Sequence, residues 1–276
     1  MKRRLAITPV ISSSTRSESV EMTVLYTALL VIVSFLSNRP SSGQIQTGAP
    51  WPMFGRNQFH TSNSPFLVNP SSSGKLRWTL PIGAVSRSSP SIGSDGTIYF
   101  GTDAGVLFAV SSTSDIIWKY QTGGSIVSTP AISSKDMIFF GSEDKYIYAL
   151  QASTGSLIWR YRVGDIVMSS PVLDSENSVY CGAGSTFYAI YDTGVLKWKA
   201  SVRGITAASA ALSSDGILFL SSYFSVHPFN SLYSFRSFDG SSLLPPLSFG
   251  GGPVAYSSPT VSEEYSENVL GMFYEC

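Results

Sequence analysis

Few side chains in this sequence could ligate a metal or transfer a proton. His60 and His227 are the only histidines, and Cys181 and Cys276 are the only cysteines. They do not stand at the spacings of zinc sites, and the chain has no phosphate-binding loop, dinucleotide fingerprint or nucleophile elbow. We therefore expect each histidine to be solvated or locally bonded, with a metal or general-base role as the alternative.

The remaining polar candidates have ordinary structural explanations. Cys181 follows Ser178-Val179-Tyr180 and precedes Gly182, which predicts a buried thiol in a strand, and a disulfide to Cys276 stays open. An acidic cluster is predicted to be a solvated face, with a calcium site as the alternative. It consists of Glu263, Glu264 and Glu267. Four aspartates are expected to make local hydrogen bonds in turns: Asp95, Asp103, Asp136 and Asp215.

The composition is typical of many short strands joined by tight turns. The 276 residues are 43% hydrophobic and only 13% charged, about half the usual charged share. Lys and Arg number 18, as do Asp and Glu, so no basic field suggests nucleic acid.

The elements that hold these side chains are set by an internal repeat. Trp78, Trp118, Trp159 and Trp198 are separated by 40, 41 and 39 residues. A second series keeps the same phase: Pro90, Pro130, Pro171 and, degraded, Ala210. Such a period predicts one supersecondary unit per repeat.

Each repeat reads as four strands of about five residues. In the first repeat these are residues 88–92, 97–101, 106–110 and 116–120. The sequence therefore predicts an all-β fold, a β-propeller of four-stranded antiparallel blades. Glycines should close the second strand where a side chain would crowd the next blade: Gly101, Gly141 and Gly182. Each Trp should pack on the adjacent blade and bond its indole N–H at the rim.

The blades are expected near residues 81–120, 121–160, 161–200 and 201–250, with a partial fifth at 251–276. In the fourth, residues 217–220 and 231–235 are the middle strands, and the Trp is lost near Leu243-Leu244. The fifth supplies at most two strands, so the ring should be open or truncated. Residues 44–80 form a lead-in with the first Trp strand.

Residues 1–43 are predicted to be a signal peptide, or an uncleaved signal anchor, with a linker. Lys2-Arg3-Arg4 opens the chain, and residues 24–36 are an apolar run too short to span a bilayer, which takes about 20 residues. The alternative is a buried strand or helix of the domain. We expect the protein in the secretory pathway or outside the cytosol, either secreted or held at a membrane by this segment.

The repeat resembles the pyrroloquinoline-quinone-type propeller repeat of the quinoprotein dehydrogenase-like proteins. The resemblance rests on Ser88-Ser89-Pro90, Asp95-Gly96, Ile98-Tyr99-Phe100-Gly101, Tyr148-Ala149-Leu150, Thr154-Gly155 and the tryptophans. Residues 51–61 look like the lead-in that often precedes the first blade. The resemblance implies either a quinone-dependent dehydrogenase or a protein-binding scaffold.

The chain departs from the dehydrogenases that it resembles. They have a complete ring, a vicinal cysteine pair and carboxylate ligands for calcium. Here the cysteines are not adjacent, and the Asp that usually follows the third strand is replaced by Ser111, Gln151 and Tyr191. No catalytic, metal or cofactor-binding residue can be carried over.

The sequence favours a non-catalytic interaction scaffold. An enzyme is less favoured but is not excluded. No cofactor is expected. The alternative is an oxidoreductase that uses pyrroloquinoline quinone with calcium, or a degenerate or truncated copy of one. The expected partner is a protein, or missing blades, that completes the ring. A nucleic-acid partner is not expected. Contact with a membrane is expected only through the N-terminal segment, if that segment is not cleaved.

Overall fold

The computed structural model describes residues 30–33, 46, 49–62, 76–223, 229–250, 258–261 and 268–272. Every regular element in these ranges is a β-strand. Across the same residues, no helix is long and apolar enough to cross a membrane.

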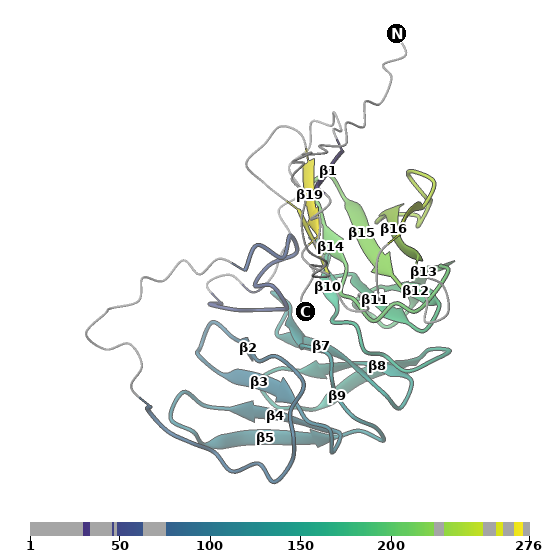
Figure 1. Cartoon of the computed structure of the whole chain (residues 1–276). Coiled ribbons are helices and arrows are strands. Elements are labelled where there is room, and N and C mark those ends of the chain that lie inside the picture. Colours follow the sequence, from purple (N-terminus) through teal and green to yellow (C-terminus); the bar gives the residue numbers. More distant parts are fainter. Residues whose placement is uncertain are drawn as a thin grey trace, which may run out of the picture.

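Four antiparallel four-stranded sheets, here called blades 1 to 4, follow one another in chain order (Figure 1). Blade 1 contains β2 (Ser91–Ile92), β3 (Ile98–Gly101), β4 (Val106–Val110) and β5 (Ile116–Gln121). Blade 2 contains β6 (Ala131–Ile132), β7 (Met137–Ser142), β8 (Tyr146–Gln151) and β9 (Leu157–Arg162). Blade 3 contains β10 (Val172–Leu173), β11 (Val179–Ala183), β12 (Thr186–Ile190) and β13 (Leu196–Ser201). Blade 4 contains β14 (Ala211–Leu212), β15 (Ile217–Ser222), β16 (Phe229–Arg236) and β17 (Leu247–Gly250). The predicted propeller fold is confirmed.

The blades are stacked so that their middle strands are buried on both faces. Every residue of β7, β11 and β15 is buried. One continuous apolar cluster runs through blades 2, 3 and 4, and a second joins blades 1 and 2. Strands buried on both faces are apolar throughout instead of alternating, because neither face meets water.

The innermost strands are shorter than the five residues predicted. The first strand of each blade is only two residues long, and in blades 1 to 3 it begins directly after Pro90, Pro130 or Pro171. Proline offers no N–H to the ladder. Polar groups just outside the ladder instead bond to the next blade: the Ser88 hydroxyl donates to the Ser128 carbonyl over 2.8 Å.

The outer strand of blade 4 follows the place of the lost Trp. That place was predicted near Leu243-Leu244, and β17 begins at Leu247. The intervening Pro245 and Pro246 cannot donate to a ladder, so regular pairing resumes only after them, with Leu232 opposite Leu247.

A fifth sheet combines both ends of the chain. Its order is β1 (Leu30–Val33), β19 (Asn268–Met272) and β18 (Pro259–Val261), all antiparallel. Leu30–Val33 is the one part of the predicted apolar leader that the structure describes, and its backbone is a strand of the domain. The signal peptide stays a prediction.

Candidate functional site at the axis and the loop end

Trp118, Trp159 and Trp198 each lie over the glycine turn of the following blade. A Cβ added at Gly155 would come within 2.6 Å of Cδ2 of Trp118, and one at Gly240 within 2.5 Å of Cδ2 of Trp198. The indole N–H groups donate to carbonyls of the same turns, with Trp118 bonding Ala152 over 2.9 Å. The other bonds of this kind are Trp78 to Ser112, Trp159 to Asp192 and Trp198 to Ser237. These four side chains connect one repeat to the next, and each indole N–H is already hydrogen-bonded in this contact.

The strand glycines lie where the following blade enters its inner strand. A Cβ at Gly101 would lie 2.6 Å from Cβ of Ile126, and one at Gly141 would lie 2.7 Å from Cβ of Val167. Gly182 approaches Thr206 in the same way. Any larger residue would push neighbouring blades apart.

The lead-in occupies the inner edge of the blades. The N–H groups of equivalent inner-strand residues donate to its carbonyls: Ile92 to Trp51 (2.7 Å), Ile132 to Pro52 (2.8 Å), Leu212 to Gln58 (2.8 Å) and Val261 to Phe59 (3.0 Å). Innermost strands of a propeller line its central channel, so the described lead-in fills the place where an axial ligand would bind.

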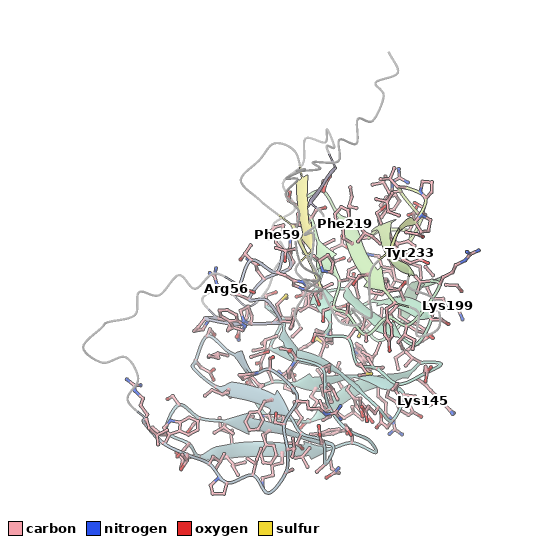
Figure 2. All side chains as sticks on the ribbon, viewed as in Figure 1. Arg56, Phe59, Lys145, Lys199, Phe219 and Tyr233 are labelled. Atoms are coloured by element: carbon pink, nitrogen blue, oxygen red, sulfur yellow. The ribbon has the colours of Figure 1, made fainter. Side chains whose placement is uncertain are left out.

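Side chains of the lead-in are buried as well. Met53 joins the main apolar cluster, and Phe59 packs beside Phe219 where blade 4 meets the fifth sheet (Figure 2). His60 was expected to be solvated or locally bonded, but it is buried and its Nδ1 bonds the carbonyl of Pro259 over 3.0 Å, 199 residues away. Burial lowers the pKa of His60 to about 4, and the bond to Pro259 opposes this only in part.

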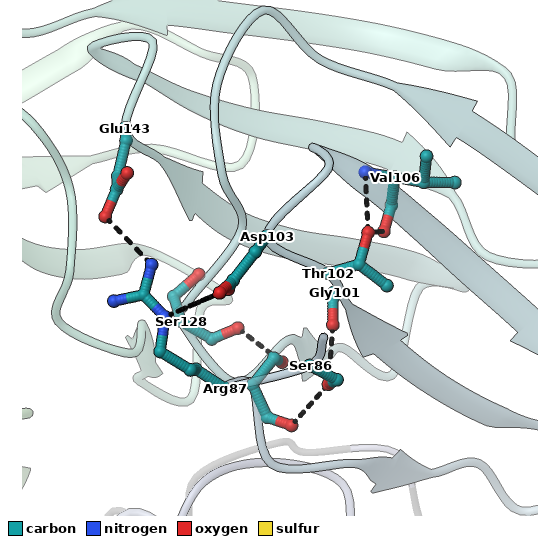
Figure 3. A network of polar contacts seen from close by, with 9 residues as sticks. Ser86, Arg87, Gly101, Thr102, Asp103, Val106, Ser128 and Glu143 are labelled. Atoms are coloured by element: carbon teal, nitrogen blue, oxygen red, sulfur yellow. Dashed lines mark hydrogen bonds and ion pairs between the residues drawn. The ribbon is translucent and has the colours of Figure 1, made fainter. Parts of the chain in front are cut away.

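The connections between blades and the β3–β4, β7–β8 and β11–β12 turns lie together at one end of the blades, here called the loop end. Charged side chains link neighbouring hairpins there. Arg87 Nε lies 3.0 Å from both carboxylate oxygens of Asp103 in blade 1, and its Nη2 lies 3.7 Å from Oε1 of Glu143 in blade 2 (Figure 3). Asp103 therefore makes a non-local ion pair instead of the local bonds predicted. All three side chains are at least a quarter exposed, so the network fixes loop positions more than it adds stability.

The other predicted turn aspartates are bonded nearby. Asp95 accepts from the backbone and hydroxyl of Thr97. Asp215 accepts from the Ser213 hydroxyl, and Asp136 from the side chain of Gln151 across the hairpin.

A pocket of about 260 Å³ opens between the loops of blades 3 and 4. Its wall is mainly apolar, and Ile166 and Ile205 hold equivalent places in the two connections, 37% and 40% exposed. Asp165 contributes a carboxylate that is 3.9 Å from Lys145. The full lining is Asp165, Ile166, Met168, Gly184, Ile205, Thr206, Ala207 and Tyr223. Its shape and chemistry suit an apolar side chain with a basic neighbour.

A buried polar cluster in blade 3 was not found from the sequence. Lys197 Nζ lies 3.5 Å from Asp174 and 3.1 Å from the hydroxyl of Tyr180, which itself donates to Asp174 over 2.7 Å. Burial, and then the neighbouring Asp174, raise the pKa of Tyr180. The signal was a lysine where the other repeats place Ile117 and Ile158. Among the described residues, no buried side-chain polar atom lacks a partner, so the cluster presents no spare group to a substrate.

Cys181 is a free, buried thiol in β11. Its sulfur lies 3.2 Å from the hydroxyl of Ser169, and burial raises its pKa to about 12. Such a thiol is inert at neutral pH. The remaining candidates, His227, Cys276, Glu263, Glu264 and Glu267, lie outside the described residues.

Comparisons with known proteins identify the repeat. Residues 131–233 match the family model described as "Outer membrane protein assembly factor BamB". These residues are propeller repeats of the pyrroloquinoline-quinone type. A search of curated protein sequences finds no match to the chain.

Among solved structures that are similar to this chain, two dehydrogenases share its fold with TM-scores above 0.6. Quinohemoprotein alcohol dehydrogenase from Comamonas testosteroni is 14% identical with a TM-score of 0.64, over 79% of this chain and 44% of that one. A europium-containing methanol dehydrogenase is 16% identical with a TM-score of 0.62, over 71% and 48%. BamB from Moraxella catarrhalis is 15% identical with a TM-score of 0.48, over 73% and 87%. The chain thus spans less than half the length of the two dehydrogenases.

The described part of the pyrroloquinoline-quinone-type repeats does not fit the quinone with calcium. It contains no group of three His, Cys, Asp or Glu side chains placed to hold a metal ion. The inner-strand N–H groups of Ile92, Ile132, Leu212 and Val261 are already bonded to the lead-in. No catalytic step can be derived through that group from these residues.

Proposed function

We propose that the chain is a non-catalytic interaction scaffold that works outside the cytosol. The observation that carries the proposal is the occupied axis: the lead-in fills the inner edge of the blades, and the loop end is the surface left for a partner. The match of residues 131–233 to the family described as an assembly factor supports a role in protein assembly. The location outside the cytosol rests on the apolar run at residues 24–36.

The loop end has the features of a protein contact surface. Val85, Ile166 and Ile205 hold equivalent places in the connections that precede blades 1, 3 and 4, where the connection before blade 2 has Ser125. Each of the three apolar residues exposes more than a third of its surface. An apolar pocket with a charged rim is the common anatomy of an interaction site, since the buried centre supplies affinity and the rim supplies orientation. The partner that fits is a protein segment with an apolar anchor next to a lysine or arginine, which would meet Asp165.

Site-specific photocrosslinking in cells that express the protein tests this function. A photoreactive residue at position 166 or 205 should crosslink to one identifiable protein, and the same probe at 117, 49% exposed on the outer strand β5, should not. Ile166→Asp should reduce the crosslink from position 205 at least fivefold. Equal crosslinking from 117 would contradict the assigned surface. Dye-linked alcohol or sugar oxidation after adding pyrroloquinoline quinone and Ca²⁺ to the purified protein would overturn the non-catalytic role.

A further inference from the structure

In three of the four blades, a backbone hydrogen bond ties the turn between the second and third strands to the connection that precedes the blade. The N–H groups of the turns donate to carbonyls of the connections: Asp103 to Val85 (2.9 Å), Glu143 to Ser125 (2.9 Å) and Tyr223 to Ile205 (3.2 Å). In blade 3 the equivalent residues are Gly184 and Ile166, since Gly184 follows Gly182 by two positions, as Glu143 follows Gly141. Within the described part of the chain, these two residues do not make the bond.

The bond is missing because the turn of blade 3 is one residue shorter. Three residues stand between the paired ends of β7 and β8, and two stand between those of β11 and β12. The Gly184 carbonyl accepts from the N–H and the hydroxyl of Thr206 in the next connection, each over 2.8 Å. In blade 2, Ser142 accepts the equivalent bond from Val167 over 3.2 Å. Gly184 therefore takes the place of Ser142, and no turn residue is left to reach Ile166.

The carbonyl of Ile166 is thus left without a donor from the described residues. Its N–H is already bonded, to Oδ1 of Asp165 over 2.9 Å. Ile166 and Gly184 both line the pocket of about 260 Å³, so the pocket lies between the two residues whose bond is missing. An apolar side chain that fills the pocket displaces the water beside this carbonyl. Such an occupant loses affinity unless it also supplies a hydrogen-bond donor.

The corresponding place between blades 1 and 2 is closed by the chain's own side chains (Figure 3). Arg87 stands where blade 3 has Met168 in the pocket wall. Asp103 stands where blade 3 has Gly184. Arg87 bonds the Asp103 carboxylate over 3.0 Å and lies 3.7 Å from Glu143. Blade 3 has neither charge at these positions, so its pocket wall stays mainly apolar.

We propose that the pocket binds an extended segment of a partner protein by adding one backbone bond to the loop end. The apolar anchor residue of this segment enters the pocket and donates its N–H to the Ile166 carbonyl, as Glu143 does to Ser125 within blade 2. This inference rests on the proposed scaffold function and specifies the partner at the same site.

The missing donor and the charge of the rim define the occupant further. A helix does not fit, because its N–H groups beyond the first turn are bonded to its own carbonyls. The Asp165 carboxylate is 57% exposed, so a lysine or arginine next to the anchor is complementary to it.

Exchanging the turn of blade 3 for that of blade 2 tests the proposal in the crosslinking assay. Copying Glu143-Asp144-Lys145 in place of Gly184-Ser185 restores the three-residue turn, so the chain supplies its own donor to Ile166. The crosslink from position 205 should fall about tenfold, the loss expected when one backbone bond of the partner is left unmade. Ser185→Glu is the matched control, because it adds the same net charge and keeps the two-residue turn. Its crosslink should be unchanged.

A second measurement does not depend on the folding of the turn variant. The partner peptide that crosslinks to position 205 is identified by mass spectrometry, and is synthesised with and without a methyl group on the backbone nitrogen of its apolar anchor. The unmethylated peptide should move the carbonyl carbon resonance of Ile166 in the nuclear magnetic resonance spectrum of the full chain. Methylation should weaken binding about tenfold, whereas methylation of the terminal residue of the peptide should not.

The outcomes separate this inference from the scaffold function. Equal binding of the two peptides, a helical bound peptide, or a full crosslink in a folded turn variant would overturn the backbone contact and leave the scaffold function standing. A wild-type chain that gives no crosslink from position 205 would overturn the scaffold function at this surface, and this inference with it.

Discussion

At the scale of single residues, neighbouring blades are held together by pairs in which a larger side chain packs against a glycine. Trp118, Trp159 and Trp198 cover the turn glycines Gly155, Gly194 and Gly240 of the next blade. The strand glycines leave room for side chains of the next blade, which are Ile126, Val167 and Thr206. The sequence period thus marks contacts between blades, because each member of these pairs recurs about every forty residues.

Replacing Gly141 with alanine should destabilise the fold. The new Cβ would meet Val167, which is fully buried and cannot retreat, so the overpacking should cost about 1–3 kcal/mol. Gly164→Ala is the matched control: its Cβ would have nothing nearer than 3.5 Å, and we expect a change within about 0.5 kcal/mol. Urea unfolding at pH 7.5 measures both. Equal stability of the two variants would show that the close approach at Gly141 is wrong.

At the scale of elements, the middle strands could be predicted and the inner edge could not. Apolar runs such as residues 97–101 and 106–110 predict β3 and β4 because burial on both faces leaves a strong signal. The two-residue inner strands leave almost none, since a run of two residues is too short to show a pattern. The path of the lead-in was not predictable either, because its bonds to Ile132 and Leu212 are long-range and made by its backbone.

His60 makes the docking of the lead-in sensitive to pH. Its pKa is lowered by burial from 6.5 to about 4, so the unfolded chain binds a proton more readily than the folded one. Stability should therefore fall as the pH drops from 6.5 towards 4, by about 2 kcal/mol between pH 7.5 and pH 5. His60→Phe should remove this part of the pH dependence and keep the dependence due to other groups. Parallel urea curves for the two proteins at both pH values would contradict a buried, neutral His60.

At the scale of the whole molecule, the described chain is a row of blades whose inner edge is occupied by the lead-in. The fold could be predicted from the repeat, because the tryptophan and proline series keep the same period. The function could not, since no catalytic constellation is present in the sequence. What the structure adds is the position of the lead-in along the inner edge, which leaves the loop end as the surface for a partner.

The most direct test of this account is amide hydrogen exchange at single-residue resolution on the full chain. If the lead-in binds the inner edge, the N–H groups of Ile92, Ile132, Leu212 and Val261 should exchange as slowly as those of β7 and β11, because their acceptors are the lead-in carbonyls. Slow exchange in β7 and β11 with rapid exchange at these four amides would contradict the occupied axis, and rapid exchange throughout would contradict the blades themselves.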